Sequence, residues 1–184
     1  VEQYPKSEFA PAAHMALGEY YFDNHQIDKA ISNYGRVVEL HAPDGKHYEK
    51  GLYKLAWSHY KLSSYDRCLD LLAKLLDWSD ENFQKTGKDS AMEPEAIEYT
   101  AISFSDMADN TGSDPITVAQ RFYRRIGQRS YEDKVYERLA DVLMQQARYG
   151  EAIATYDYMM KRWPNEPKNP TYMWTVARLY RSLD

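Results

Sequence analysis

Small residues recur along this chain in pairs twelve positions apart, and this recurrence constrains the fold more than any other feature. The three clearest pairs are Gly18 with Ala30, Ala56 with Cys68, and Ala140 with Ala152. Large apolar residues follow the second member of each pair by four positions, at Tyr34, Leu72 and Tyr156. Small side chains are required where two helix backbones approach closely, and large ones fill the space between neighbouring units. The pattern therefore predicts a repeated helix–turn–helix unit that buries its faces by stacking.

The repeated unit resembles that of the tetratricopeptide repeat (TPR) family, whose units are about 34 residues long. Leu17-Gly18, Leu55-Ala56 and Leu139-Ala140 stand where the family has its first-helix Leu-Gly/Ala motif, and Trp163-Pro164 stands where its closing proline belongs. The resemblance covers nearly the whole chain. It implies an all-α fold, a right-handed TPR solenoid of antiparallel helix pairs, with about four pairs plus one lone final helix.

We expect a single TPR array over residues 1–184, with units near 10–43, 48–80, 94–129 and 132–164 and a final helix over 170–183. Pro94, Pro115 and Pro170 mark helix starts. Ala101 and Ala119 are eighteen positions apart instead of twelve, so about six inserted residues are expected near 109–114. A longer insertion, 78–92, joins units two and three, and part of it is expected to continue the preceding helix. Neither end shows a convincing polar cap, which predicts a fragment of a longer protein.

Composition and charge argue against several classes of protein. The chain has 184 residues, of which 43% are hydrophobic, and a formal net charge of −5. Lysines and arginines are scattered, so no basic stripe indicates a nucleic-acid partner. The arginines near residue 124 spread around a helix and are interpreted mainly as a solvated face, with a docking patch as the alternative. No apolar run approaches the length needed for a membrane span, and one cysteine excludes an internal disulfide framework.

In the TPR family the first helix of each unit lines a concave groove, so the resemblance implies a partner-binding surface there. In unit two, Tyr53, Trp57 and Tyr60 share one helical stripe, and lysines flank it. We expect at least Trp57 to be exposed in the groove, while the alternative is that these rings pack against the next helix. The complete set of expected partner-binding residues is Phe22, Lys50, Tyr53, Lys54, Trp57, Tyr60, Tyr99, Arg138, Asp141, Trp174 and Arg178.

No catalytic residue, cofactor or metal site is predicted, because the sequence holds no nucleophile motif or phosphate-binding loop. Cys68 occupies a small-residue position and is expected to be a buried structural thiol. His41 and His47 are close in sequence, but their loop provides too few fixed ligands for a metal ion. The carboxylate clamp known from chaperone-binding TPR proteins is also not expected. Lys134 and Arg138 fit its third unit, whereas Tyr53 and Trp57 replace its polar residues.

These observations predict a non-enzymatic scaffold that binds a protein or peptide partner. The joints at 4–13 and 163–167 resemble those of bacterial envelope TPR proteins, such as the Tol-Pal-associated protein, the outer-membrane assembly lipoprotein, and delta-proteobacterial gliding or predation relatives. That resemblance implies an envelope complex for assembly, motility or envelope maintenance, located in the periplasm or cell envelope, with the cytoplasm as the alternative. Two other functions stay open: a structural spacer that self-associates through exposed solenoid ends, and a substrate-selecting TPR segment of a larger enzyme.

Overall fold

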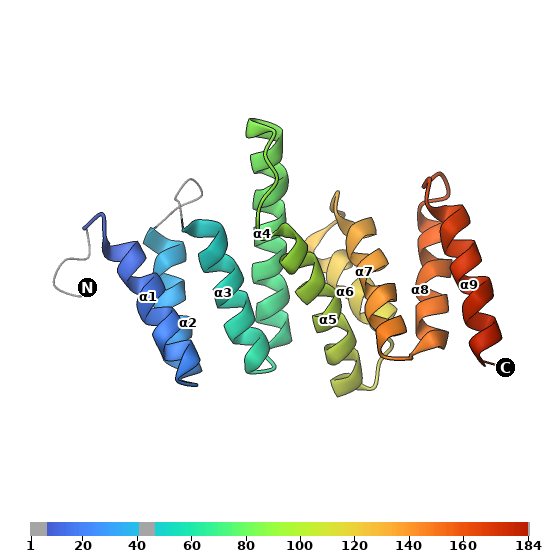
Figure 1. The fold of residues 1–184 in the computed structure, drawn as a ribbon, viewed down its shortest axis with the longest axis horizontal. Coiled ribbons are helices and arrows are strands. Elements are labelled where there is room, and N and C mark those ends of the chain that lie inside the picture. The colour runs from blue at the N-terminus through green and yellow to red at the C-terminus, as the bar shows by residue number, and fades with distance from the viewer. Residues whose placement is uncertain (1–6, 41–46, 184) are drawn as a thin grey trace. The chain divides into compact units, whose positions relative to one another are not determined.

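The computed structural model describes residues 7–40 and 47–183, and these residues form helices joined by short turns (Figure 1). The chain divides into two compact units, Val1–Ala96 and Ile97–Asp184, with the boundary inside one helix. The helices are α1 (Ala10–Asp23), α2 (Ile27–Leu40), α3 (Tyr48–Lys61), α4 (Tyr65–Thr86), α5 (Glu93–Thr111), α6 (Pro115–Ile126), α7 (Glu132–Gln145), α8 (Tyr149–Arg162) and α9 (Asn169–Leu183).

Unit 1 is built on close approaches between neighbouring helices. A Cβ atom on Gly18 of α1 would lie 2.5 Å from Cε1 of Tyr34 on α2, a distance that two carbon atoms do not tolerate. Ala30, on the facing side of α2, is completely buried. Between α2 and α3, a Cβ on Gly51 would lie 2.9 Å from a methyl carbon of Val37. The prediction that small residues mark the helix contacts is therefore confirmed in this unit.

The same turn joins the two helices of three pairs. Residues His25, Ser63 and Ala147 adopt left-handed backbone conformations with φ of 58°, 54° and 57°. After each of them, a backbone N–H donates to a carbonyl five residues earlier, with donor–acceptor distances of 2.8, 2.9 and 2.9 Å at Gln26, Ser64 and Arg148. These bonds close the preceding helix in the manner of a Schellman motif. The repeat seen in the sequence is thus a repeat of backbone geometry.

The third pair, α5 and α6, uses a related turn at Gly112, where φ is 64°. Ser113 N–H donates to the carbonyl of Ala108 at 3.0 Å, as in the other turns. This equivalence gives Ser105, instead of Ala101, the place that Gly18 has in α1. Helix α5 starts twelve residues before Ser105, whereas α1 starts eight before Gly18. The expected insertion of about six residues at 109–114 is therefore corrected: four of the extra residues form a turn at the N-terminal end of α5, which runs through Thr111, and two remain between Ser105 and Ala119.

Helix α4 continues through much of the expected insertion and ends at Thr86, and Figure 1 shows it projecting beyond α3. Gly87, with φ of 69°, closes the helix. The connection that follows is attached to unit 1 by two serine hydroxyls. Ser79 donates to the Glu93 carboxylate at 2.6 Å, and Ser90 donates to the Glu49 carboxylate at 2.7 Å. The connection is thereby held against α3 and α4.

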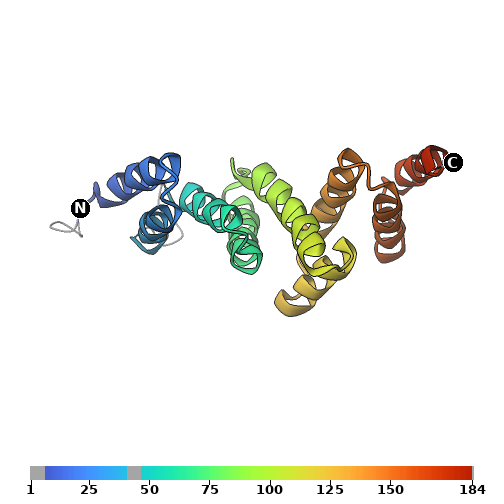
Figure 2. The same ribbon diagram turned by 90° about the horizontal axis from the view of Figure 1, so that it is seen from below.

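Unit 2 has a core of buried side chains from α7 and α8, among them Tyr136, Leu139 and Ala152. Helix α9 lies beside α8 in both views (Figures 1 and 2), and the rings of Tyr156 and Tyr172 stack with centroids 5.2 Å apart. Pro115 is the first residue of α6, while Pro94 and Pro170 are the second residues of α5 and α9. All three prolines therefore start helices as predicted. None of the described helices combines the length and apolar character of a bilayer span.

Candidate functional site

Trp57 is the centre of a cluster of aromatic rings in unit 1. Its indole stacks on the ring of Phe22 from α1, with centroids 4.5 Å apart and planes 25° apart. The indole is also nearly parallel to the ring of Tyr53, one turn earlier in α3, with centroids 6.5 Å apart and planes 13° apart. Trp57 is therefore partly buried: its indole packs on a neighbouring helix, as the alternative expected, and part of its surface stays accessible. The reason is that Phe22, on the neighbouring helix pair, covers one face of the indole.

Lysine side chains lie over the same indole. The ammonium nitrogens of Lys54 and Lys61 are 5.3 and 5.5 Å from its ring centroid, within the range of cation–π attraction. Neither lysine has an ion pair with a carboxylate in the described part of the chain. Lys50 differs, since its Nζ lies 2.7 Å from Oε1 of Glu19. We use the term Trp57 surface for the group of Phe22, Tyr53, Lys54, Trp57 and Lys61.

Tyr60 is part of a different contact. Its ring meets the ring of Tyr65, at the start of α4, edge to face with centroids 5.9 Å apart. Tyr60 therefore packs across the α3–α4 turn. The other predicted residues of unit 1 belong to the Trp57 surface, except for Lys50, which lies in its ion pair with Glu19. One end of the aromatic stripe predicted on α3 thus lies at the turn to α4.

The predicted residues on α7 are engaged within unit 2. The Arg138 guanidinium forms a short hydrogen-bonded ion pair with Glu98 and lies 3.8 Å from Asp141. Asp141 accepts a hydrogen bond from the Tyr156 hydroxyl at 3.3 Å. Burial raises the pKa of Asp141, and the Tyr156 hydrogen bond and Arg138 oppose that rise. Tyr99 is partly buried on α5. Arg138 therefore pairs with the carboxylates of Glu98 and Asp141. Together with the Tyr156 hydrogen bond, these contacts link α5, α7 and α8.

On α9, the two predicted residues form a pair at the surface. Trp174 is 61% exposed, and the Arg178 guanidinium carbon lies 4.6 Å from its ring centroid. One turn of helix separates the two residues, which explains why they meet. Apart from Tyr99, the predicted residues thus belong to three local groups: the Trp57 surface with its neighbours, the Arg138–Asp141 group, and the α9 pair.

The described residues contain no group of three or more histidine, cysteine, aspartate or glutamate side chains placed to hold a metal ion. His41, one of the two loop histidines, lies outside the described residues. Cys68 is completely buried, as its small-residue position predicts.

A pocket between α6, α7 and α8 was not anticipated from the sequence. Its aromatic residues, Tyr123, Tyr136 and Tyr158, are widely separated along the chain. No local spacing relates them, and only the packing of three helices brings them together. The arginines near residue 124 were visible in the sequence, but their helical spacing alone predicts a solvated face and not a pocket.

Comparison with known proteins gives structural likeness without sequence likeness. No family model and no curated protein sequence matches the chain. The crystal structure of MamA protein is similar, with 14% identity over 95% of this chain and 83% of that chain and a TM-score of 0.50. A putative kinesin light chain from Podosopora anserina, with nearly identical TPR-like repeats, gives 12% identity, coverages of 95% and 88%, and a TM-score of 0.48.

The Rap conjugation gene regulator of plasmid pLS20, in complex with the Phr* peptide, gives 16% identity over 90% of this chain and 46% of that chain, with a TM-score of 0.47. At these identities the likeness concerns the fold alone. The likeness to MamA agrees with the helix pairs described above. The chain has the all-α helical-repeat fold of TPR-like proteins.

Proposed function

We propose that this chain is a non-enzymatic scaffold whose Trp57 surface binds an acidic segment of a partner protein. The observation that carries the proposal is the position of two lysines, Lys54 and Lys61, over one indole. Their ammonium groups have no carboxylate partner among the described residues of the chain. A partner with aspartate or glutamate side chains supplies the missing negative charge.

The aromatic part of the surface supplies contact area. Trp57 is held by stacking on Phe22 and Tyr53, so its orientation is fixed before a partner arrives. A fixed ring loses little conformational entropy on binding, and tryptophan is enriched among residues that contribute at least about 2 kcal/mol to an interface. Complementary charge around such a ring raises the association rate and helps to exclude other partners. The proposed partner segment therefore combines acidic and apolar side chains.

The proposal assigns no catalysis to this chain. Its single cysteine, Cys68, is completely buried, so its thiol is not accessible as a nucleophile in the folded state. The charged residues Arg138 and Asp141 hydrogen-bond or pair with neighbouring side chains and link helices of unit 2. A role in selecting substrates for a larger enzyme would use the same binding surface.

The cellular setting is a further part of the proposal. We place the scaffold in a bacterial cell-envelope complex that serves assembly, motility or envelope maintenance. The support is the resemblance of the joints at 4–13 and 163–167 to those of envelope TPR proteins. Fractionation of source cells, with an antibody against the native protein, tests this setting. Recovery in the cytoplasmic fraction alone would exclude it.

Charge reversal tests the binding surface. A Lys54→Glu, Lys61→Glu variant is compared with a Lys88→Glu, Lys161→Glu control, which changes the net charge equally at exposed lysines elsewhere. A fluorescent peptide of alternating glutamate and leucine serves as the probe in anisotropy titrations. We expect the wild type and the control to bind it, with an affinity that falls as salt is added, and the first variant to lose binding. Equal affinities for the two variants would refute the proposal.

Truncation of the ring gives an independent test with natural partners. Cross-linking in source cells is carried out with the wild type and with Trp57→Ala, after circular dichroism has shown equal helix content. Partners that are captured by the wild type and lost by Trp57→Ala are expected to carry acidic segments. Capture of the same partners by both proteins would move the binding site away from the Trp57 surface.

A second candidate function is self-association, and helix α9 favours it. Three of its large apolar side chains, Met173, Trp174 and Tyr180, are 62%, 61% and 55% exposed. Such a face gains free energy when another surface covers it. Sedimentation velocity is expected to show a concentration-dependent oligomer that Met173→Glu, Tyr180→Glu dissociates. A wild type that stays monomeric at high concentration would exclude this candidate.

A further inference from the structure

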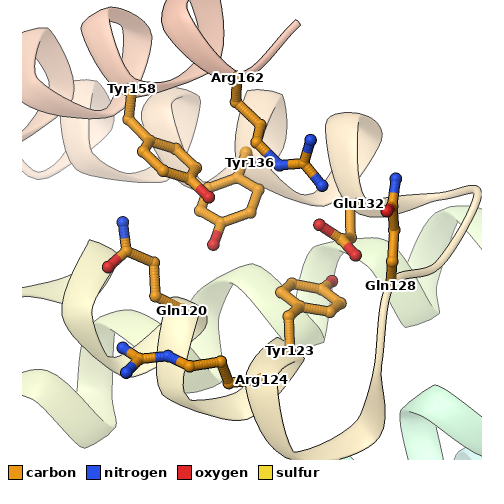
Figure 3. A pocket seen from close by; sticks show the side chains of 8 residues that line it. All are labelled: Gln120, Tyr123, Arg124, Gln128, Glu132, Tyr136, Tyr158 and Arg162. Carbon is orange, nitrogen blue, oxygen red and sulfur yellow. The ribbon is translucent and has the colours of Figure 1, made fainter.

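Unit 2 contains a pocket of about 500 Å³ between α6, α7 and α8, and Figure 3 shows the residues that line it. Its volume lies in the range typical of small-molecule sites, about 300–1,000 Å³. Three phenol rings form part of the lining, and their centroids are 5.8 Å apart for Tyr123 and Tyr136 and 4.9 Å apart for Tyr136 and Tyr158. The charged side chains in the lining are those of Arg124, Glu132 and Arg162.

The hydroxyl of Tyr123 is a buried polar group at this pocket. The residue is 6% exposed, and its hydroxyl oxygen has no hydrogen-bond partner among the described residues. Most buried polar groups in folded proteins have a partner, so an exception calls for an explanation. Burial raises the pKa of Tyr123, and nearby Glu132 acts in the same direction. The hydroxyl therefore keeps its proton and remains a hydrogen-bond donor at neutral pH.

The guanidinium groups at the pocket also have unused donors. Arg162 lies over the ring of Trp163, with its guanidinium carbon 5.5 Å from the centroid. In the described part of the chain, neither Arg124 nor Arg162 forms an ion pair with a carboxylate. Figure 3 shows the Arg162 side chain directed toward the side of the pocket that holds Glu132, while Arg124 points away from it. Arg162 is thus the cation best placed to meet an anionic group in the pocket.

Glu132 makes the pocket selective among anions. It is 4% exposed, and its Oε1 accepts a hydrogen bond from the backbone N–H of Arg129 at 2.8 Å. Its negative charge disfavours a ligand with two or more negative charges, such as a phosphate dianion. The same carboxylate favours a ligand that also carries an N–H or O–H donor. The pocket therefore presents donors for one anionic group and an acceptor for one donor.

We propose that this pocket binds a small aromatic carboxylate that carries a hydrogen-bond donor beside its carboxyl group. Arg162 and the Tyr123 hydroxyl bind the carboxylate, Glu132 accepts the donor, and the ligand ring packs against Tyr158. N-acylated aromatic amino acids have this chemistry, and so does the aromatic C-terminal residue of a peptide. The site lies in unit 2 and does not depend on the Trp57 surface of unit 1.

Calorimetric titration of the whole chain tests the proposal with two probes. One is N-acetyl-L-tyrosine, and the other is a short peptide that ends in tyrosine with a free carboxylate. The carboxamide of each probe is its control. We expect saturable binding of at least one acid and none of its amide. Binding of the peptide alone would assign the ligand to a chain terminus, whereas tighter binding of N-acetyl-L-tyrosine than of the peptide would assign it to the small acid.

Two variants connect the binding to the pocket. Tyr123→Phe removes only the hydroxyl and is expected to weaken binding about tenfold, the usual effect of losing one hydrogen bond to a charged group. Arg162→Gln, at an exposed position, is expected to weaken binding at least as much and to reduce its salt dependence. Tyr34→Phe is the matched control, because Tyr34 in unit 1 also has a buried hydroxyl without a partner.

The outcomes separate a ligand site from a packing defect. Weaker binding by Tyr123→Phe and Arg162→Gln, with unchanged binding by Tyr34→Phe, supports the proposal. If neither acid binds saturably, or if both pocket variants bind as tightly as the wild type, the pocket is not such a site. The Tyr123 hydroxyl is then only a polar group that the fold leaves without a partner.

Discussion

The contact between Gly18 and Tyr34 gives a residue-scale prediction. In Gly18→Ala, the added methyl group meets the Tyr34 ring at 2.5 Å, and the ring is completely buried. Overpacking of this kind costs about 1–3 kcal/mol. Gly35→Ala in the facing helix is the control, because a Cβ there has no neighbour within 4 Å. It is expected to stabilise by up to about 1 kcal/mol through helix propensity. Urea denaturation measures both, and a stabilising Gly18→Ala would contradict the contact.

His59 gives a prediction about pH. Burial, assisted by Arg67, lowers the pKa of His59 below its ordinary value of 6.5. The unfolded chain therefore binds a proton at this residue at a higher pH than the folded chain does, so stability falls as pH drops below about 6.5 toward the folded pKa. His59→Gln is expected to lose this part of the pH dependence. Denaturation of both proteins at pH 7.5 and pH 5.5 checks this, and identical losses on acidification would contradict it.

Residue identities were partly predictable at this scale. Size alone identified Gly18, Ala30 and Cys68 as helix contacts, because a close approach admits few side chains. The partners of Trp57 and Arg138 were not predictable. Phe22 reaches Trp57 from another helix pair, and Glu98 reaches Arg138 from another helix. Contacts of this kind depend on how the helices pack and not on spacing within one helix.

The repeated turn gives a prediction at the scale of elements. Ala147 adopts φ of 57°, a left-handed conformation that costs a residue with a Cβ about 1–2 kcal/mol. Ala147→Gly removes this strain and is expected to stabilise the chain by about 0.5–1 kcal/mol, after the entropy that glycine adds to the unfolded state. The same substitution at Ala154, exposed within α8, is expected to destabilise by about 1 kcal/mol. Thermal unfolding of both variants measures the sign, and equal destabilisation would mean that the turn stores no strain.

Helix starts were predictable from proline, whereas the register of the third pair was not. Ala96, Ala101 and Ala108 of helix α5 are all completely buried, so the sequence offers several candidates for the position of closest approach. Only the turn at Gly112 identifies Ser105 as the equivalent of Gly18. Ser105 also donates to Gln146 Oε1 at 3.0 Å and accepts from Arg148 at 2.8 Å. A polar residue with such partners does not stand out in a pattern of small apolar ones.

At the scale of the whole molecule, the division into two compact units predicts how far the effect of a destabilising substitution extends along the chain. In repeat folds each helix pair is stabilised mainly by its neighbours, so a local defect stays local. Gly18→Ala is expected to speed amide hydrogen exchange in α1, α2 and α3, while exchange in α7, α8 and α9 keeps its wild-type rates. Mass spectrometry of peptic fragments measures this. Equal acceleration in both units would show that the chain opens as one cooperative body.

The burial of Cys68 has a practical consequence for measuring such openings. It is the only thiol of the chain, and none of its surface is accessible while α4 is packed. A thiol reagent such as Ellman's disulfide therefore reacts only with molecules in which this part of unit 1 has transiently opened. When closing is much faster than modification, the ratio of the observed rate to that of a free thiol gives the fraction of open molecules. The native chain thus carries its own chromogenic reporter of unit 1, with no engineered label.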